Sequence, residues 1–205
     1  MSTDVRMGFK EAARFFVDTV ARVPDDRWDA PGLGSWSVRE VAAHTAHTFE
    51  AISGYDSPSR TAERIELSNV TEFYLTVLDP GRSAARDRRA QERARQLSDD
   101  PSSAIREKAD GALAVLDAIP DDHPSQAIGG GVRFIDWLAT RVVELTVHSL
   151  DIARALDIDA DAPAAALTVT LNVLSELAVA TGKAGDLAIA ATGRSALPKG
   201  YSLMS

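Results

Sequence analysis

The sequence predicts a mainly α-helical protein, organised as a four-helix bundle with extra helices and a small C-terminal α/β appendage. Apolar residues recur at three- and four-residue steps along most of the 205-residue chain, as they do on the buried face of a helix. Helix-start signals precede several of these stretches, and the connections between them are short. We expect the bundle to span residues 1–160, and a short helix with a strand-like tail, packed on the bundle, to span residues 161–205.

The N-terminal part of the chain is expected to form two helices joined by a loop. The first helix covers about residues 3–23, where apolar side chains recur on one face. Residues 28–36 contain Pro and Gly and are expected to form the loop. Ser37 and Glu40 have the spacing of a capping box, in which each side chain accepts a hydrogen bond from the other residue's backbone amide. This motif predicts a second helix over residues 38–53.

The next part of the chain combines a loop, a β-branched segment and a highly charged segment. Residues 55–60 are expected to form a loop, and residues 62–78 a helix, despite many β-branched side chains. Residues 82–97 are so highly charged that we expect a solvated helix with a narrow apolar edge. This helix contains five arginines that raise the possibility of an anion-binding patch: Arg82, Arg86, Arg88, Arg89 and Arg93. An exposed helix with internal ion pairs is the favoured interpretation.

The second half of the chain alternates helices with a glycine-rich connection. A helix is expected over residues 101–119, because Ser98-Asp-Asp-Pro is a good start signal. Residues 120–131 are expected to form a loop ending in three glycines, which we interpret as a flexible connector rather than an anion cradle. Another helix is expected over residues 163–181. The tail segments 186–192 and 201–204 are expected to form a short strand pair.

Glu144 and His148 are the most informative pair in the chain. They lie four residues apart in an apolar helix predicted over residues 133–156, so both side chains emerge from one helix face. The stripe to which they belong consists of Trp137, Arg141, Glu144, His148, Asp151 and Ala155. Periodicity alone favours a solvent-exposed stripe. The alternative is a polar seam inside the bundle, which must be paired or metal-bound, because both flanks are apolar and the stripe contains a tryptophan but no lysine.

A third ligand for such a seam is available on the second predicted helix. His44 falls at the edge of the buried arc of that helix, whereas His47 points almost directly away from it. His44, Glu144 and His148 together make a set of two imidazoles and one carboxylate, which leaves a coordination position free, as in catalytic zinc sites. Zinc fits this set, and nickel, iron and manganese are alternatives.

The overall composition excludes several classes of protein. The chain has 30 acidic and 22 basic residues and a net charge of −8, which argues against a nucleic-acid partner. No stretch approaches the roughly 20 apolar residues of a membrane span, and no secretion signal is recognisable, so we expect cytoplasmic residence without a membrane partner. There is no cysteine, so any thiol chemistry must use sulfur from another molecule.

Two segments carry a recognisable pair of motifs. Residues 36–44 read WSVREVAAH and residues 141–151 read RVVELTVHSLD. These segments resemble the motifs of the mycothiol-dependent maleylpyruvate isomerase family, which belongs to the DinB-like superfamily of metal-binding four-helix bundles. The tail over residues 192–201 is also similar to the end of many members, which close on a Gly-Arg…Leu-Pro-x-Gly-aromatic pattern.

The resemblance implies a zinc site whose ligands map onto His44, Glu144 and His148. It also implies mycothiol, a cysteine-bearing pseudodisaccharide thiol of actinobacteria, as the thiol cosubstrate. Coordination to zinc deprotonates a thiol and makes it a nucleophile at neutral pH. In the isomerase, the thiolate adds to a cis double bond, the bond rotates, and elimination gives the trans product. In transferase relatives, the sulfur attacks a small electrophile and stays attached.

Three further residues are candidates for catalytic roles. Arg141 and Asp151 lie about one turn to either side of the Glu144–His148 pair, where they would orient a ligand or pair with a substrate anion. The resemblance implies a third candidate, because the isomerase uses an arginine from a larger C-terminal domain and Arg194 is the one arginine after residue 163. This reduced basic complement argues against maleylpyruvate, a dicarboxylate, as the substrate.

Two other functions are compatible with the sequence. One is a metal-dependent hydrolase that uses bound hydroxide and no thiol. The other is a non-catalytic metal-binding or scaffold protein, in which the polar seam is structural. A homodimer is compatible with each of these functions.

Overall fold

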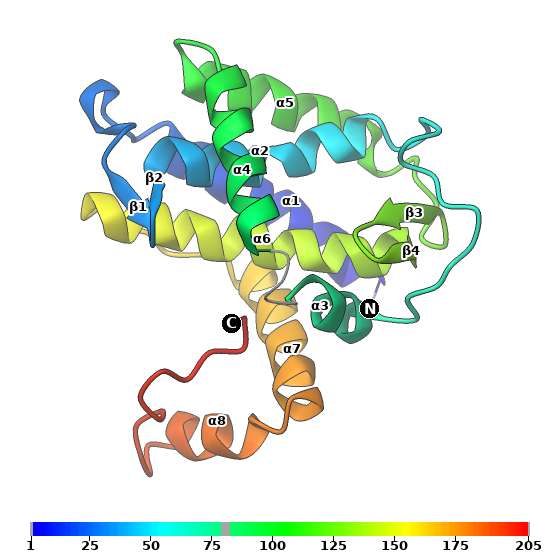
Figure 1. Cartoon of the computed structure of the whole chain (residues 1–205), viewed down its shortest axis with the longest axis vertical. Helices are drawn as coiled ribbons and strands as arrows, with labels where there is room; N and C mark the ends of the chain where they lie inside the picture. Colours follow the sequence, from blue (N-terminus) through cyan, green and yellow to red (C-terminus); the bar gives the residue numbers. More distant parts are fainter. Residues whose placement is uncertain (1, 79–82, 205) are drawn as a thin grey trace.

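A four-helix bundle forms the centre of the molecule (Figure 1). Its members are α1 (Ser2–Val20), α2 (Val38–Ser53), α5 (Pro101–Leu116) and α6 (Phe134–Leu156). In this computed structural model, which describes residues 2–78 and 83–204, α1 packs mainly on α6, and α2 packs on α5 and α6. The largest side chains that fill the bundle without solvent exposure include Phe9, Phe16, Phe49, Leu138 and Leu145. The predicted mainly α-helical fold is therefore confirmed.

Local signals in the sequence explain where two bundle helices begin. The Ser37 hydroxyl accepts a hydrogen bond from the Glu40 amide at 3.2 Å, and the Glu40 carboxylate accepts one from the Ser37 amide at 2.8 Å. Before α5, the Asp100 carboxylate accepts a hydrogen bond from the Ser103 amide at 3.0 Å, and Pro101 occupies the first turn. Each cap satisfies backbone amides that have no partner inside their own helix. The predicted capping box is confirmed.

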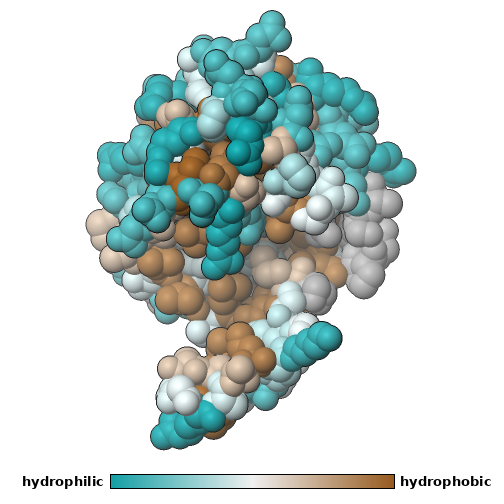
Figure 2. Space-filling view, turned by 90° about the vertical axis from the view of Figure 1, so that its left-hand side faces the viewer, coloured by the Kyte–Doolittle hydropathy of each residue, from teal (hydrophilic) through white to brown (hydrophobic). Residues whose placement is uncertain are grey.

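The remaining helices surround or extend the bundle. α3 (Val70–Val77) contacts α6 and α7, α4 (Ser83–Gln96) packs across α2, and α7 (Ala164–Ala180) packs on α1 and α6. α8 (Ala184–Ala191) contacts α7 and has no buried residue. Figure 2 shows the C-terminal part as a smaller lobe below the main body. Among the helices of the described residues, none combines the length and the apolar character needed to cross a membrane. The division at residue 160 stays a prediction.

Two short hairpins replace loops that were expected from the sequence. β1 (Pro31–Leu33) pairs with β2 (Trp36–Ser37), and β3 (Pro124–Ala127) pairs with β4 (Gly130–Arg133), both antiparallel. The second hairpin also holds the segment before α3. Single bridges join Thr61 to Ser125 and Leu67 to Val132, so residues 61–69 are extended and the helix expected over residues 62–78 forms only in its second half. That expectation was wrong because a distant hairpin supplies backbone partners for the segment.

The three glycines of the second hairpin are required by its geometry. Gly129 has a φ of +99°, which side-chain-bearing residues rarely adopt. A Cβ on Gly131 would lie 1.9 Å from the carbonyl oxygen of Arg64, because the extended segment passes directly over β4. The interpretation of this run as a flexible connector was therefore wrong.

The C-terminal tail contains no strand pair over its described residues, so that expectation was also wrong. Residues 186–191 belong to α8, where four alanines favour a helix. Residues 201–204 have no regular structure, but two hydrogen bonds hold them. The Lys183 ammonium donates to the Ser202 carbonyl at 2.5 Å, and the Tyr201 hydroxyl donates to the Lys183 carbonyl at 3.1 Å.

Substitution of Gly131 tests the close approach between the extended segment and the hairpin. We expect Gly131→Ala to lower the free energy of unfolding by about 1–3 kcal/mol, since the added methyl must displace backbone. Gly185→Ala is the matched control, because nothing lies within 4 Å of the added Cβ in α8. Denaturant unfolding measures both changes. Equal stability of the two variants would contradict the observed packing.

Candidate metal centre

The antiparallel arrangement of α2 and α6 brings three polar side chains together (Figure 1). Nε2 of His44 lies 3.2 Å from Oε2 of Glu144, and Nε2 of His148 lies 3.3 Å from the same oxygen. One ligand atom from each of the three residues lies within 4.8 Å of the others. The structure therefore brings together the three side chains selected from the sequence, although they come from positions up to 104 residues apart.

The three side chains of the cluster are mostly buried, but each remains partly accessible to solvent. The side chains of His44, Glu144 and His148 are 18%, 18% and 15% exposed. The whole stripe on α6, from Trp137 to Ala155, has intermediate burial, so it is neither the exposed face that periodicity favours nor a fully buried seam. His47 turns away, as expected, and its Nδ1 lies 2.9 Å from Oε2 of Glu50.

Trp36 covers one side of His44. The two rings lie 5.0 Å apart between centroids at an angle of 59°, and the indole N–H of Trp36 donates to Oδ1 of Asp87 on α4 at 3.1 Å. This contact ties α4 to the cluster. Trp36 begins the first of the two motifs, so a signal for it is present in the sequence, whereas nothing in the sequence around Asp87 indicates the contact.

His148 is held between two carboxylates. Its Nε2 faces Glu144, and its Nδ1 lies 3.1 Å from Oδ2 of Asp151. Burial opposes a charge on this ring, but the hydrogen bonds to Asp151 and Glu144 outweigh burial and raise the pKa of His148 to about 9. In the metal-free protein at neutral pH, His148 is therefore an imidazolium between two carboxylates.

Glu144 and His44 differ from His148 in charge. Glu144 is an anion and His44 is a neutral imidazole, whereas His148 is an imidazolium. Burial disfavours the carboxylate of Glu144, but hydrogen bonds from His148 and His44 prevail and hold its pKa well below the ordinary value. Burial lowers the pKa of His44, so this ring is neutral at pH 7. Because a carboxylate only accepts hydrogen bonds, the proton of His44 lies on Nε2. Its buried Nδ1 has no hydrogen-bond partner among the described residues.

The donor set fits a divalent metal ion such as zinc. Zn–N and Zn–O bonds of about 2.0–2.1 Å place two ligands of a tetrahedral ion about 3.3 Å apart. The two contacts to Glu144, at 3.2 and 3.3 Å, already have this separation. Asp151 bonds the outer nitrogen of His148, as carboxylates commonly do behind metal-binding histidines. The roles of these residues as ligands stay a prediction.

The two arginines considered as catalytic candidates lie in different places. The guanidinium carbon of Arg141 lies 5.3 Å from the ring centroid of Trp137 and 5.7 Å from that of Phe73, and its Nε donates to the Thr140 hydroxyl at 2.9 Å. Arg141 is thus fixed one turn from Glu144. Arg194 is exposed and follows α8, which Figure 1 places at the opposite end of α7 from the bundle, so the structure does not bring Arg194 to the cluster.

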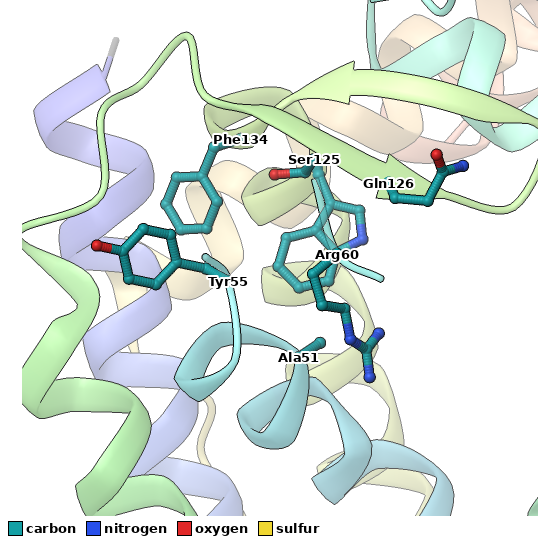
Figure 3. Close-up of a pocket in the computed structure, with 7 residues that line it drawn as sticks. Ala51, Tyr55, Arg60, Ser125, Gln126 and Phe134 are labelled. Atoms are coloured by element: carbon teal, nitrogen blue, oxygen red, sulfur yellow. The ribbon is translucent and has the colours of Figure 1, made fainter. Parts of the chain in front are cut away.

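A narrow pocket lies farther along the same pair of helices (Figure 3). It is lined by Ala51 of α2, Phe134 and Trp137 of α6, Ser125 and Gln126 of β3, and Tyr55 and Arg60 of the intervening turn. Trp137 and Ala51 each lie seven residues, or about two helical turns, from Glu144 and His44 on their own helices. Sequence reasoning missed Arg60, because only the hairpin contact brings its segment to this position.

The protonation of His148 predicts a pH-dependent metal affinity. Because the pKa of His148 is raised to about 9, metal binding at pH 7 must displace its proton. We expect release of about one proton per metal ion, and an affinity that falls roughly tenfold per pH unit below pH 9. Calorimetric zinc titrations in buffers of different ionisation enthalpy measure the proton count. An unchanged heat across buffers would contradict this prediction.

Asp151→Asn tests the carboxylate behind His148. An amide cannot accept with the strength of a carboxylate, so we expect zinc affinity to fall about 10–100-fold. Asp157→Asn is the control, because Asp157 is an exposed residue at the end of the same helix and its left-handed φ of 54° suits asparagine. Competition with a fluorescent chelator gives both affinities. Equal affinities in the two variants would exclude a role for Asp151.

Comparison with known proteins agrees with this geometry. Residues 9–153 match the family model described as Mycothiol maleylpyruvate isomerase N-terminal domain. Comparison with curated proteins and with solved structures gave no significant match. The matched segment contains His44, Glu144 and His148 and extends over the helices that position them. This chain belongs to the mycothiol maleylpyruvate isomerase N-terminal domain family.

Proposed function

We propose that this protein is a zinc-dependent, mycothiol-using transferase or isomerase that acts on a small electrophile. The convergence of His44, Glu144 and His148 carries the proposal, because their separations suit a metal with a free coordination position. Family membership supports a mycothiol-related activity. The absence of cysteine is consistent with a sulfur nucleophile that arrives with the cosubstrate.

The three clustered residues would hold the ion, and Asp151 would fix the tautomer and orientation of His148. When bound, zinc would lower the pKa of a thiol at its free position and so supply a nucleophile at neutral pH. The low exposure of the three side chains limits water around the reacting sulfur, which strengthens electrostatic interactions in the site.

Arg141 is the residue best suited to bind an anionic group of the substrate near this centre. Among the described residues it forms no ion pair, and its guanidinium is held by two aromatic rings and the Thr140 hydroxyl. A cation held in this way retains most of its donors for a ligand. We therefore propose that Arg141 positions the electrophile next to the sulfur.

The proposal extends to partners and location. The net charge of −8 favours a small-molecule substrate over a nucleic acid, and we expect the reaction to occur in the cytoplasm. A homodimer is also a prediction. Exposed apolar side chains on α7, α8 and the tail, namely Leu171, Val179, Ile189 and Leu197, are compatible with it.

Loss of one metal-binding histidine tests the proposal. We expect protein reconstituted with zinc at neutral pH to hold about one equivalent, and to consume mycothiol in the presence of a model electrophile such as monobromobimane. His148→Ala should lower both the zinc content and the rate of mycothiol consumption, because the site loses a ligand. We expect the rate to fall by at least about 100-fold. Metal analysis and thiol titration measure the two effects.

His47→Ala is the control for metal content, since His47 lies one turn from His44 and faces Glu50. It should retain zinc, whereas His44→Ala should not. Wild-type protein that binds no zinc after reconstitution would refute the proposal. Zinc-dependent ester hydrolysis without added thiol would instead support a hydrolase.

A further inference from the structure

A cluster of charged side chains lies beside α2, with members from α4, α5 and the turn after α2. Nη2 of Arg60 lies 3.5 Å from Nε2 of His47. Nδ1 of His47 lies 2.9 Å from Oε2 of Glu50, and the Lys108 ammonium donates to Oε1 of Glu50 at 2.5 Å. Both oxygens of Glu50 are therefore engaged, and Arg60 has a neutral imidazole as its polar partner.

Arg93 brings a second guanidinium to this cluster. It lies on α4 and is half-buried. Burial lowers the pKa of Arg93, and the positive charges of Arg89 and Arg60 lower it further, while Glu50 and Glu92 act in the opposite direction. After burial, the positive charges of Arg93 and Arg60 also lower the pKa of His47, and α4 packs on α2, so both guanidinium groups act on this ring. Several positive charges therefore lie near one another around the half-buried Arg93.

Cations outnumber carboxylates among the charged groups that act on one another in the described part of this cluster. Its cations are Arg60, Arg89, Arg93 and Lys108, and its carboxylates are Glu50 and Glu92. Within the described part of the chain, none of the three arginines lies at ion-pair distance from a carboxylate. Other cations do, such as Arg6 with Asp121 at 2.6 Å and Arg133 with Asp136 at 2.6 Å. In a chain of net charge −8, the imbalance does not reflect a shortage of acidic residues.

The structure therefore changes the interpretation of the arginine-rich helix. Its helical character is confirmed from Ser83 onward, and Arg82 lies outside the described residues. The internal ion pairs expected along it do not form among its described side chains, where Arg88, Arg89 and Arg93 have no carboxylate partner. Of these three arginines, Arg93 alone is half-buried, which favours a role in anion binding over a position on a solvated surface.

We propose that Arg60 and Arg93 bind a small oxyanion, a phosphate or carboxylate group, beside His47. Guanidinium groups match the geometry of such anions with paired N–H donors. Because the Nδ1 proton of His47 faces Glu50, its Nε2 accepts from Arg60 and uses one of the five donors of that guanidinium. Figure 3 shows Arg60 beside Ala51, with its guanidinium directed away from Tyr55 and Phe134, toward α2.

The site is separate from the candidate metal centre but adjacent to it. His47 follows His44 by three residues on α2, which corresponds to about 4.5 Å along the helix axis. The two clusters share no side chain. The bound oxyanion is therefore either the anionic group of a substrate whose reactive atom lies near the metal, or a separate phosphate that binds independently of turnover.

Titration with inorganic phosphate at constant ionic strength tests the proposal. We expect saturable binding by calorimetry, together with a rise in melting temperature that chloride does not reproduce. Arg60→Gln and Arg93→Gln should each weaken phosphate binding at least tenfold. Arg88→Gln removes the same charge from an exposed position on α4 and should leave the affinity within about twofold.

The expected stability of Arg93→Gln allows a loss of phosphate binding to be distinguished from unfolding. Since Arg93→Gln removes a repulsive charge, it should be at least as stable as the wild type in phosphate-free buffer, so a loss of binding would not reflect unfolding. No saturable phosphate effect in the wild type, or an equal loss in Arg88→Gln, would overturn the proposal. Persistence of tight binding in the double variant Arg60→Gln/Arg93→Gln would also overturn it.

Two further measurements identify the source of the anion and separate this proposal from the enzymatic one. His148→Ala should still bind phosphate, even though it loses zinc, because the two clusters share no residue. In the zinc-loaded wild type, competition of phosphate or succinate with an electrophile that carries a carboxylate would assign the site to the substrate. Binding that this electrophile does not displace would assign it to free phosphate. Both results support the site, whereas loss of phosphate binding in His148→Ala would contradict its independence.

Discussion

The antiparallel packing of α2 against α6 is the constraint on which the candidate metal centre depends. A slip of one helical turn, about 5.4 Å, would replace His44 with another side chain and separate the ligands by more than a metal can bridge. Two local devices fix the positions of these helices along the chain. The Ser37–Glu40 capping box sets the start of α2, and the β3–β4 hairpin, held by the close approach at Gly131, precedes α6 directly.

The two clusters on α2 differ in their chemical character. Around His44, the carboxylate of Glu144 and two imidazoles offer ligand atoms for a cation, and the charges of Glu144 and Asp151 offset those of His148 and Arg141. Around His47, arginines exceed carboxylates, so this place attracts an anion. Side chains at three-residue spacing on a helix point about 60° apart, which allows one helix to support both environments side by side. A ligand that spans them would present a metal-binding atom at one end and a negative charge at the other.

Sequence reasoning succeeded where the signal was local and failed where a distant segment supplied the partner. The stripe on α6 and the position of His44 on α2 follow from helical geometry alone, so the residues of the cluster were predictable. The extended segment over residues 61–69 depends on backbone partners in β3 and β4, which lie about 60 residues later. The pairing of Arg60 with His47 depends on that same path. In the tail, we expected a strand over residues 186–192, but the intrinsic preference of alanine for helix prevailed.

The separation of His44 and Glu144 by 100 residues has a consequence for biogenesis. During synthesis the ligand set is incomplete until the second half of α6 has left the ribosome, so the nascent chain has no metal site while α1 to α5 are emerging. An ion captured afterwards would tie together segments that the unfolded chain holds far apart, and it would oppose the opening of the intervening loop as a cross-link does. Metal supply in the cell would then govern how long each newly made molecule survives proteolysis.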